Sequence, residues 1–126
     1  MTELKYIELK SGYQDNGPAW IGIVKVSHSG RTLYFNDHAF QKAREGKGWY
    51  FDVETGESYW ISGVKKDGTD RHWAASGYGR IQIARDAVAE YLAITGEKEI
   101  DLRRLEIVDL PVSYPVERIQ KLLNEK

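Results

Sequence analysis

Apolar and polar residues alternate along much of the first 85 positions, a pattern typical of β-strands with one buried face. The stretch at 5–10 alternates apolar with charged residues, and 19–27 is rich in β-branched and aromatic side chains. Gly22, inside the second stretch, indicates a bulge or a close approach of backbone. We predict strands at 5–10, 19–27, 31–36, 49–53, 57–64, 69–74, 80–84 and 104–110.

Turn residues connect several of these strands into hairpins. Gly56 supplies the positive φ that a short loop between the fourth and fifth predicted strands needs. The pair Asp67-Gly68 favours a tight turn between the fifth and sixth. The segment 37–48 is less regular. Because Asp37 is suited to cap a helix, we predict a short helical turn there that the following glycines end.

The spacing of apolar residues lengthens towards the end of the chain, which predicts two helices. Asp86 is suited to the N-cap of a helix that runs to Thr95, and Gly96 stands at its C-cap position. Residues 116–123 repeat apolar side chains at helical spacing, and Pro115 fits the first turn of that helix. We expect this last helix to pack on the sheet; the alternative is that it docks into a groove of a partner.

Many short strands followed by two helices predict an α+β fold. The strands indicate a small antiparallel β-barrel or a strongly bent sheet, compatible with an SH3-like or OB-like roll, with two C-terminal helices. Helices do not alternate with strands, so a doubly wound nucleotide-binding sheet is not expected. The chain has 126 residues and no inter-domain linker, which predicts a single domain over 1–126.

The composition indicates where the protein is located more clearly than it indicates which chemistry the protein performs. The chain contains no apolar run of about 20 residues, which excludes a membrane-spanning helix. The lack of cysteine excludes disulfides and thiol nucleophiles and favours a reducing compartment. The first residues lack the basic start and apolar core of a signal peptide, so we expect a cytoplasmic protein. A net charge of −1 gives no support to a protein that coats nucleic acid.

Charged and aromatic side chains are most concentrated around the second predicted hairpin. Residues 65–85 hold five basic and two acidic side chains, and aromatic residues are interleaved with the cations. Trp, Tyr and Arg dominate protein-binding hot spots, and the same residue types stack on and pair with single-stranded nucleic acid. The competing interpretation is ordinary aromatic packing between strands under a solvated face. The candidate binding residues are Tyr59, Trp60, Lys65, Lys66, Arg71, His72 and Trp73.

Five of these seven residues have an expected role. Trp60 and Trp73 would anchor a partner, Arg71 would make forked hydrogen bonds, and the lysines would steer the encounter. We favour a protein or peptide partner over nucleic acid because the global charge is near zero.

An enzymatic alternative rests on Asp70 and His72. Two residues apart on a strand, they would share one face, where the carboxylate could orient the imidazole as a general base of a small hydrolase. The other histidines, His28 and His38, lie in separate segments, so a metal site is not expected. We therefore favour a non-catalytic binding or accessory role without a cofactor.

The run from Asp52 to Trp73, together with the segment 16–22 (Asn-Gly-Pro-Ala-Trp-Ile-Gly), resembles a group of small uncharacterised bacterial proteins. The resemblance covers roughly the first 75 residues. It implies a bacterial cytoplasmic protein and carries no activity, cofactor or catalytic residue with it.

Overall fold

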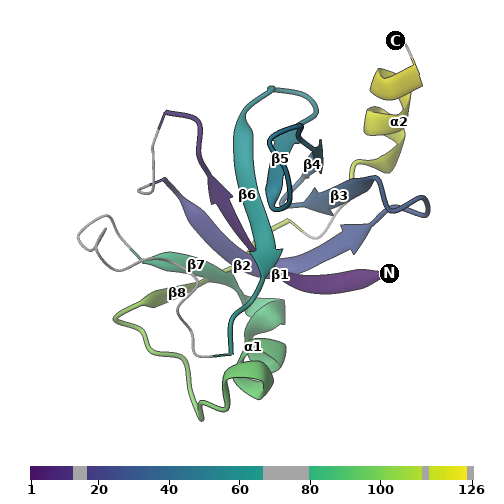
Figure 1. Ribbon diagram of the computed structural model, residues 1–126. Helices are drawn as coiled ribbons and strands as arrows, with labels where there is room; N and C mark the ends of the chain where they lie inside the picture. Colours follow the sequence, from purple (N-terminus) through teal and green to yellow (C-terminus); the bar gives the residue numbers. More distant parts are fainter. Residues whose placement is uncertain (13–16, 67–79, 112–113, 125–126) are drawn as a thin grey trace.

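The computed structural model describes residues 1–12, 17–66, 80–111 and 114–124 (Figure 1). Its first half consists of six strands: β1 (Thr2–Leu9), β2 (Ala19–Val26), β3 (Thr32–Phe35), β4 (His38–Lys42), β5 (Trp49–Asp52) and β6 (Ser58–Gly63). The second half adds β7 (Ile81–Ala84), a 3-10 turn (Arg85–Ala87), α1 (Val88–Thr95), β8 (Leu105–Val108) and α2 (Val116–Asn124).

The first six strands close into an antiparallel barrel. Each strand pairs with the next along the chain, and β1 pairs with both β2 and β6. In this seam Ile7 of β1 lies opposite Ile61 of β6. The expectation of a small α+β barrel with two C-terminal helices is confirmed.

Side chains alternate between the two sides of the barrel wall, because successive strand residues point to opposite faces. One buried cluster contains residues that point into the barrel: Ile7, Val24, Leu33, Phe35, Phe40, Tyr59 and Ile61. A second cluster lies outside, where β1 and β2 meet β7, β8 and α1. A third joins Tyr34 and Ala39 of the barrel to Ile119 of α2. The last helix therefore packs on the sheet, as expected.

One edge of β2 is shared between two neighbours. The end of β2 pairs with β3, whereas Trp20 and Ile21 near its start pair in parallel with β7. Gly22 lies between these two regions, and a Cβ atom there would stand 2.1 Å from Cε1 of Phe35. The atoms that approach Gly22 are thus those of the Phe35 ring inside the barrel, a side chain and not the backbone segment that was predicted.

The segment 37–48 differs from the sequence-based prediction of a helical turn. Asn36 and Asp37 have φ values of 53° and 63°, which two-residue hairpin turns require. Asp37 therefore helps to reverse the chain instead of capping a helix, and β4 follows directly. A similar, smaller difference occurs at Asp86, which lies in the 3-10 turn that precedes α1.

Two other predictions, a glycine turn and a glycine C-cap, are confirmed. Gly56 has a φ of 78° in the hairpin between β5 and β6, and Gly96 ends α1 with a φ of 77°. The predicted turn at Asp67-Gly68 and the strand at 69–74 lie outside the described residues. No helix in the described ranges is both long enough and apolar enough to cross a bilayer.

Candidate functional site

The structure describes four of the seven candidate binding residues. Arg71, His72 and Trp73 lie outside the described residues, as does Asp70 of the hydrolase alternative. The remaining four are Tyr59 and Trp60 on β6 and Lys65 and Lys66 just after it; both lysines are exposed.

Tyr59 and Trp60 are neighbours on a strand and so point to opposite faces. Tyr59 is only 5% exposed and packs inside the barrel edge-on against Phe40, with ring centroids 4.7 Å apart. Burial, followed by the charges of Asp52 and Glu57, raises the pKa of Tyr59 to about 12. Tyr59 therefore packs in the interior of the barrel, whereas the side chain of Trp60 lies on the outer face of β6.

Trp60 borders a cavity of about 740 Å³ at one mouth of the barrel. Its lining comes from the first half of β1, the ends of β4 and β6, the start of β5 and the loop 43–48. Three lysines and two aromatic residues dominate its wall: Lys5, Lys42, Lys47, Tyr50 and Trp60. This volume falls within the range of about 300–1,000 Å³ that is usual for ligand pockets.

Strand register explains why these side chains converge. Lys5 lies opposite Gly63 on the neighbouring strand, and Lys42 lies opposite Tyr50. Cross-strand partners share a face, so all four positions point into the barrel mouth. Gly63 has no side chain, and a Cβ added to it would meet nothing within 4 Å. The missing side chain keeps this part of the mouth open.

The loop 43–48, which supplies part of the lining, is held against β6 at Trp60. The backbone N–H of Ile61 donates to the carbonyl of Gly48 at 2.9 Å. Gly48 has a φ of 90°, and a Cβ there would lie 2.6 Å from the indole ring of Trp60. The indole N–H donates to Oγ of Ser62 at 3.1 Å, and the ring packs edge-on against Trp49 at 5.5 Å. Trp60 is thus a fixed wall of the cavity.

The cavity carries excess positive charge. Lys42 and Lys47 are exposed, and within the described residues neither forms an ion pair. Lys5 is more enclosed and pairs with Glu3 at 3.4 Å. Burial, followed by the charge of Glu3, raises the pKa of Tyr50, so its phenol stays protonated and can donate a hydrogen bond.

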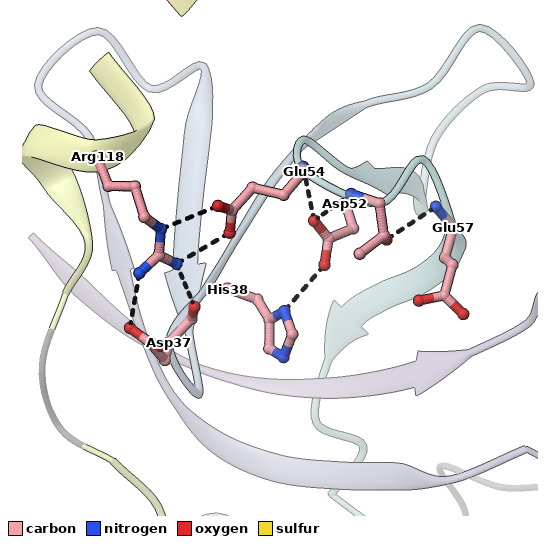
Figure 2. Close-up of polar contacts among 7 residues, drawn as sticks. Asp37, His38, Asp52, Glu54, Glu57 and Arg118 are labelled. Carbon is pink, nitrogen blue, oxygen red and sulfur yellow. Dashed lines mark hydrogen bonds and ion pairs between the residues drawn. The ribbon is translucent and has the colours of Figure 1, made fainter. Parts of the chain in front are cut away.

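The opposite mouth of the barrel contains a polar network that the sequence did not reveal (Figure 2). Asp52 is fully buried, and its carboxylate accepts hydrogen bonds from the backbone N–H groups of Glu54 and Thr55 at 2.8 and 3.2 Å. Its second oxygen lies 2.9 Å from Nδ1 of His38. The carboxylate therefore holds the β5–β6 turn, and His38 is oriented by it.

Arg118 of α2 completes this network from outside. Its guanidinium donates to both carboxylate oxygens of Glu54 at 2.9 Å and to the carbonyl oxygen of Asp37 at 2.9 Å (Figure 2). Both turns at this mouth are thereby connected to α2, which gives the network a structural role. Across the described ranges, no three His, Asp or Glu side chains are grouped so that they could hold a metal ion.

Comparisons with family models, with curated proteins and with solved structures find no match for the chain.

Proposed function

We propose that this protein is a non-catalytic binding or accessory protein whose contact surface is the cavity beside Trp60. The observation that carries the proposal is the convergence of Lys5, Lys42 and Lys47 on a cavity walled by Trp60 and Tyr50. Fixed aromatic side chains provide contact area at little entropic cost, and unpaired lysines accelerate encounter with an oppositely charged partner.

The wall chemistry favours binding over catalysis. Cations, aromatic rings and backbone line the cavity, whereas the imidazole and buried carboxylate of His38 and Asp52 lie at the other mouth. General acid–base catalysis needs such groups within hydrogen-bond reach of the substrate. We infer that the cavity retains its ligand without transforming it.

A protein or peptide is the partner that we favour. The whole chain has a net charge of −1, and three of its lysines gather around one cavity. Nucleic acid binding usually needs a basic stripe that follows the phosphate backbone. Lys65 and Lys66 follow Trp60 in the chain, just after the end of β6, and add two further positive charges. The absence of cysteine supports a role in a reducing compartment such as the cytoplasm.

Site-specific photo-crosslinking tests this proposal. A photoreactive residue replaces Lys47 at the cavity in one variant and Lys98, in the loop after α1, in the control. After irradiation in a bacterial lysate, we expect a discrete protein adduct only at position 47. The adduct should disappear when Gly63→Leu fills the mouth. Equal adducts at both positions, or an adduct at 47 that nuclease removes, would contradict a protein partner.

A further inference from the structure

We propose that the cavity beside Trp60 binds a carboxylate-rich peptide segment, and that Glu3 competes with this ligand for Lys5. The inference rests on the proposed binding function and names the chemistry of the partner and the residue that restrains its binding.

Charge complementarity supports an acidic ligand. Lys42 and Lys47 stand at the exposed rim of the cavity without ion pairs in the described part of the chain. An incoming carboxylate can pair with them without first breaking a contact within the protein. Ion pairs at such an exposed rim contribute mainly to the association rate and depend on salt.

The inner cation differs from the two at the rim. The Lys5 side chain is 26% exposed and already lies 3.4 Å from the Glu3 carboxylate. A ligand carboxylate that reaches Lys5 must therefore replace Glu3 or share the lysine with it. Glu3 is more exposed, at 42%, and lies near the start of β1, so it can move into solvent at little cost. Glu3 thus acts as an internal substitute for the ligand.

Neutral donors in the wall also suit a carboxylate. Tyr50 remains a phenol at physiological pH and lines the cavity, opposite Lys42 in the strand pair. Tyr50 and the three lysines line the same cavity, so the phenol can donate to one carboxylate oxygen of a ligand while a lysine pairs with the other. Trp60 borders the cavity from the outer face of β6 and adds an apolar edge for the methylene groups or an adjacent aromatic side chain of the peptide.

The aromatic geometry disfavours single-stranded nucleic acid at this site. Successive bases need successive exposed ring faces on which to stack. Trp49 and Trp60 instead pack against each other at an interplanar angle of 84°, and Gly48 lies against the ring of Trp60. A single walled cavity of about 740 Å³ fits one or two side chains better than a run of nucleotides.

Fluorescence anisotropy with three labelled probes tests the inference. The probes are a short glutamate-rich peptide with one phenylalanine, the same peptide with every glutamate replaced by glutamine, and a single-stranded oligothymidylate. At low salt we expect the glutamate peptide to bind about tenfold more tightly than the glutamine peptide, and more tightly than the oligonucleotide. Tighter binding of the oligonucleotide, or equal binding of the two peptides, overturns the inference.

Two charge-matched double variants locate the binding. Lys42→Gln/Lys47→Gln should weaken glutamate-peptide binding about tenfold, whereas Lys98→Gln/Lys121→Gln, with the same change in net charge, should leave it unchanged. Equal losses in both double variants would show unspecific attraction and overturn the site. Glu3→Gln should tighten binding about two- to fivefold, because it removes the competitor for Lys5. Unchanged or weaker binding in Glu3→Gln overturns the role of Glu3.

These outcomes separate the inference from the function beneath it. If the glutamate peptide fails to bind while the crosslinked adduct at position 47 persists and Gly63→Leu abolishes it, the cavity binds a protein and the acidic-ligand inference is wrong. If both fail, the proposed function is wrong as well.

Discussion

Arg118 on α2 forms two hydrogen bonds of 2.9 Å with the carboxylate of Glu54, a residue 64 positions earlier in the chain. The adjacent Ile119 is fully buried against Tyr34 and Ala39 of the barrel. One apolar and one ionic contact thus attach the last helix, and they should contribute very differently to stability.

We expect Ile119→Ala to lower the free energy of unfolding by about 2–3 kcal/mol, because it leaves a cavity beneath a short helix. Arg118→Gln should cost much less, since both partners of its ion pair are exposed to solvent. Urea unfolding monitored by circular dichroism measures both changes. Hydrogen exchange of α2 should accelerate most in Ile119→Ala, and a larger effect of Arg118→Gln at high salt would contradict this ranking.

Gly22 should be intolerant of any side chain. A methyl group there would overlap the ring of Phe35, so Gly22→Ala is expected to cost about 1–3 kcal/mol. Gly63→Ala is the matched control, because its new Cβ meets open space and its stability should change by less than about 0.5 kcal/mol. Chemical denaturation compares the two. The double variant Gly22→Ala/Phe35→Leu should recover part of the loss, and no recovery would show that the clash lies elsewhere.

Tyr59 should make the protein sensitive to alkali. Its pKa is raised to about 12 in the folded state, above the value of 10.0 expected when the side chain is free. Between these values the unfolded chain has lost the phenolic proton and the folded protein retains it, so stability falls as pH rises. The slope is about 1.4 kcal/mol per pH unit for one such group. Tyr59→Phe should flatten the decline in unfolding free energy between pH 10 and 12, measured by urea titration at each pH; an unchanged slope would refute it.

Asp52 should be important because of the groups it satisfies. Asp52→Ala removes the acceptor for two backbone N–H groups and the partner of His38, with an expected cost of about 1–3 kcal/mol. Asp52→Asn keeps an acceptor for the turn and should lose roughly half as much. Thermal unfolding at neutral pH provides the comparison. His38→Ala serves as the control for the imidazole contact alone and should be milder than Asp52→Ala.

The sequence patterns correctly predicted those elements that depend on residues close together in the chain. The hairpin around Gly56 formed because its φ of 78° suits a glycine turn, and 116–123 formed a helix whose apolar side includes Ile119. The strand β4 was missed because Asp37 is equally suited to cap a helix and to adopt a positive φ in a turn. The turn prevails over the helix cap because it lets β4 form the backbone hydrogen bonds of β3 along that edge.

The cavity was not predictable for a different reason. Lys5 and Lys42 line one cavity only because β6 returns to pair with β1, and no spacing in the sequence reports that closure. The search for basic residues near Trp60 therefore selected Lys65 and Lys66, which are close in sequence. Of the four candidate residues that the structure describes, Trp60 alone lines the cavity.

The pairing of β1 with β6 also constrains how the chain can acquire its shape during synthesis. Ile7 leaves the ribosome long before Ile61, its partner across the seam, so the first strand waits with one side unpaired while the intervening hairpins form. Loop closure over such a distance is slow compared with forming a hairpin. A nascent chain that stalls before β6 would expose the unpaired edge of β1 to other chains. Rapid synthesis of β6 shortens this exposure and so protects the chain from self-association.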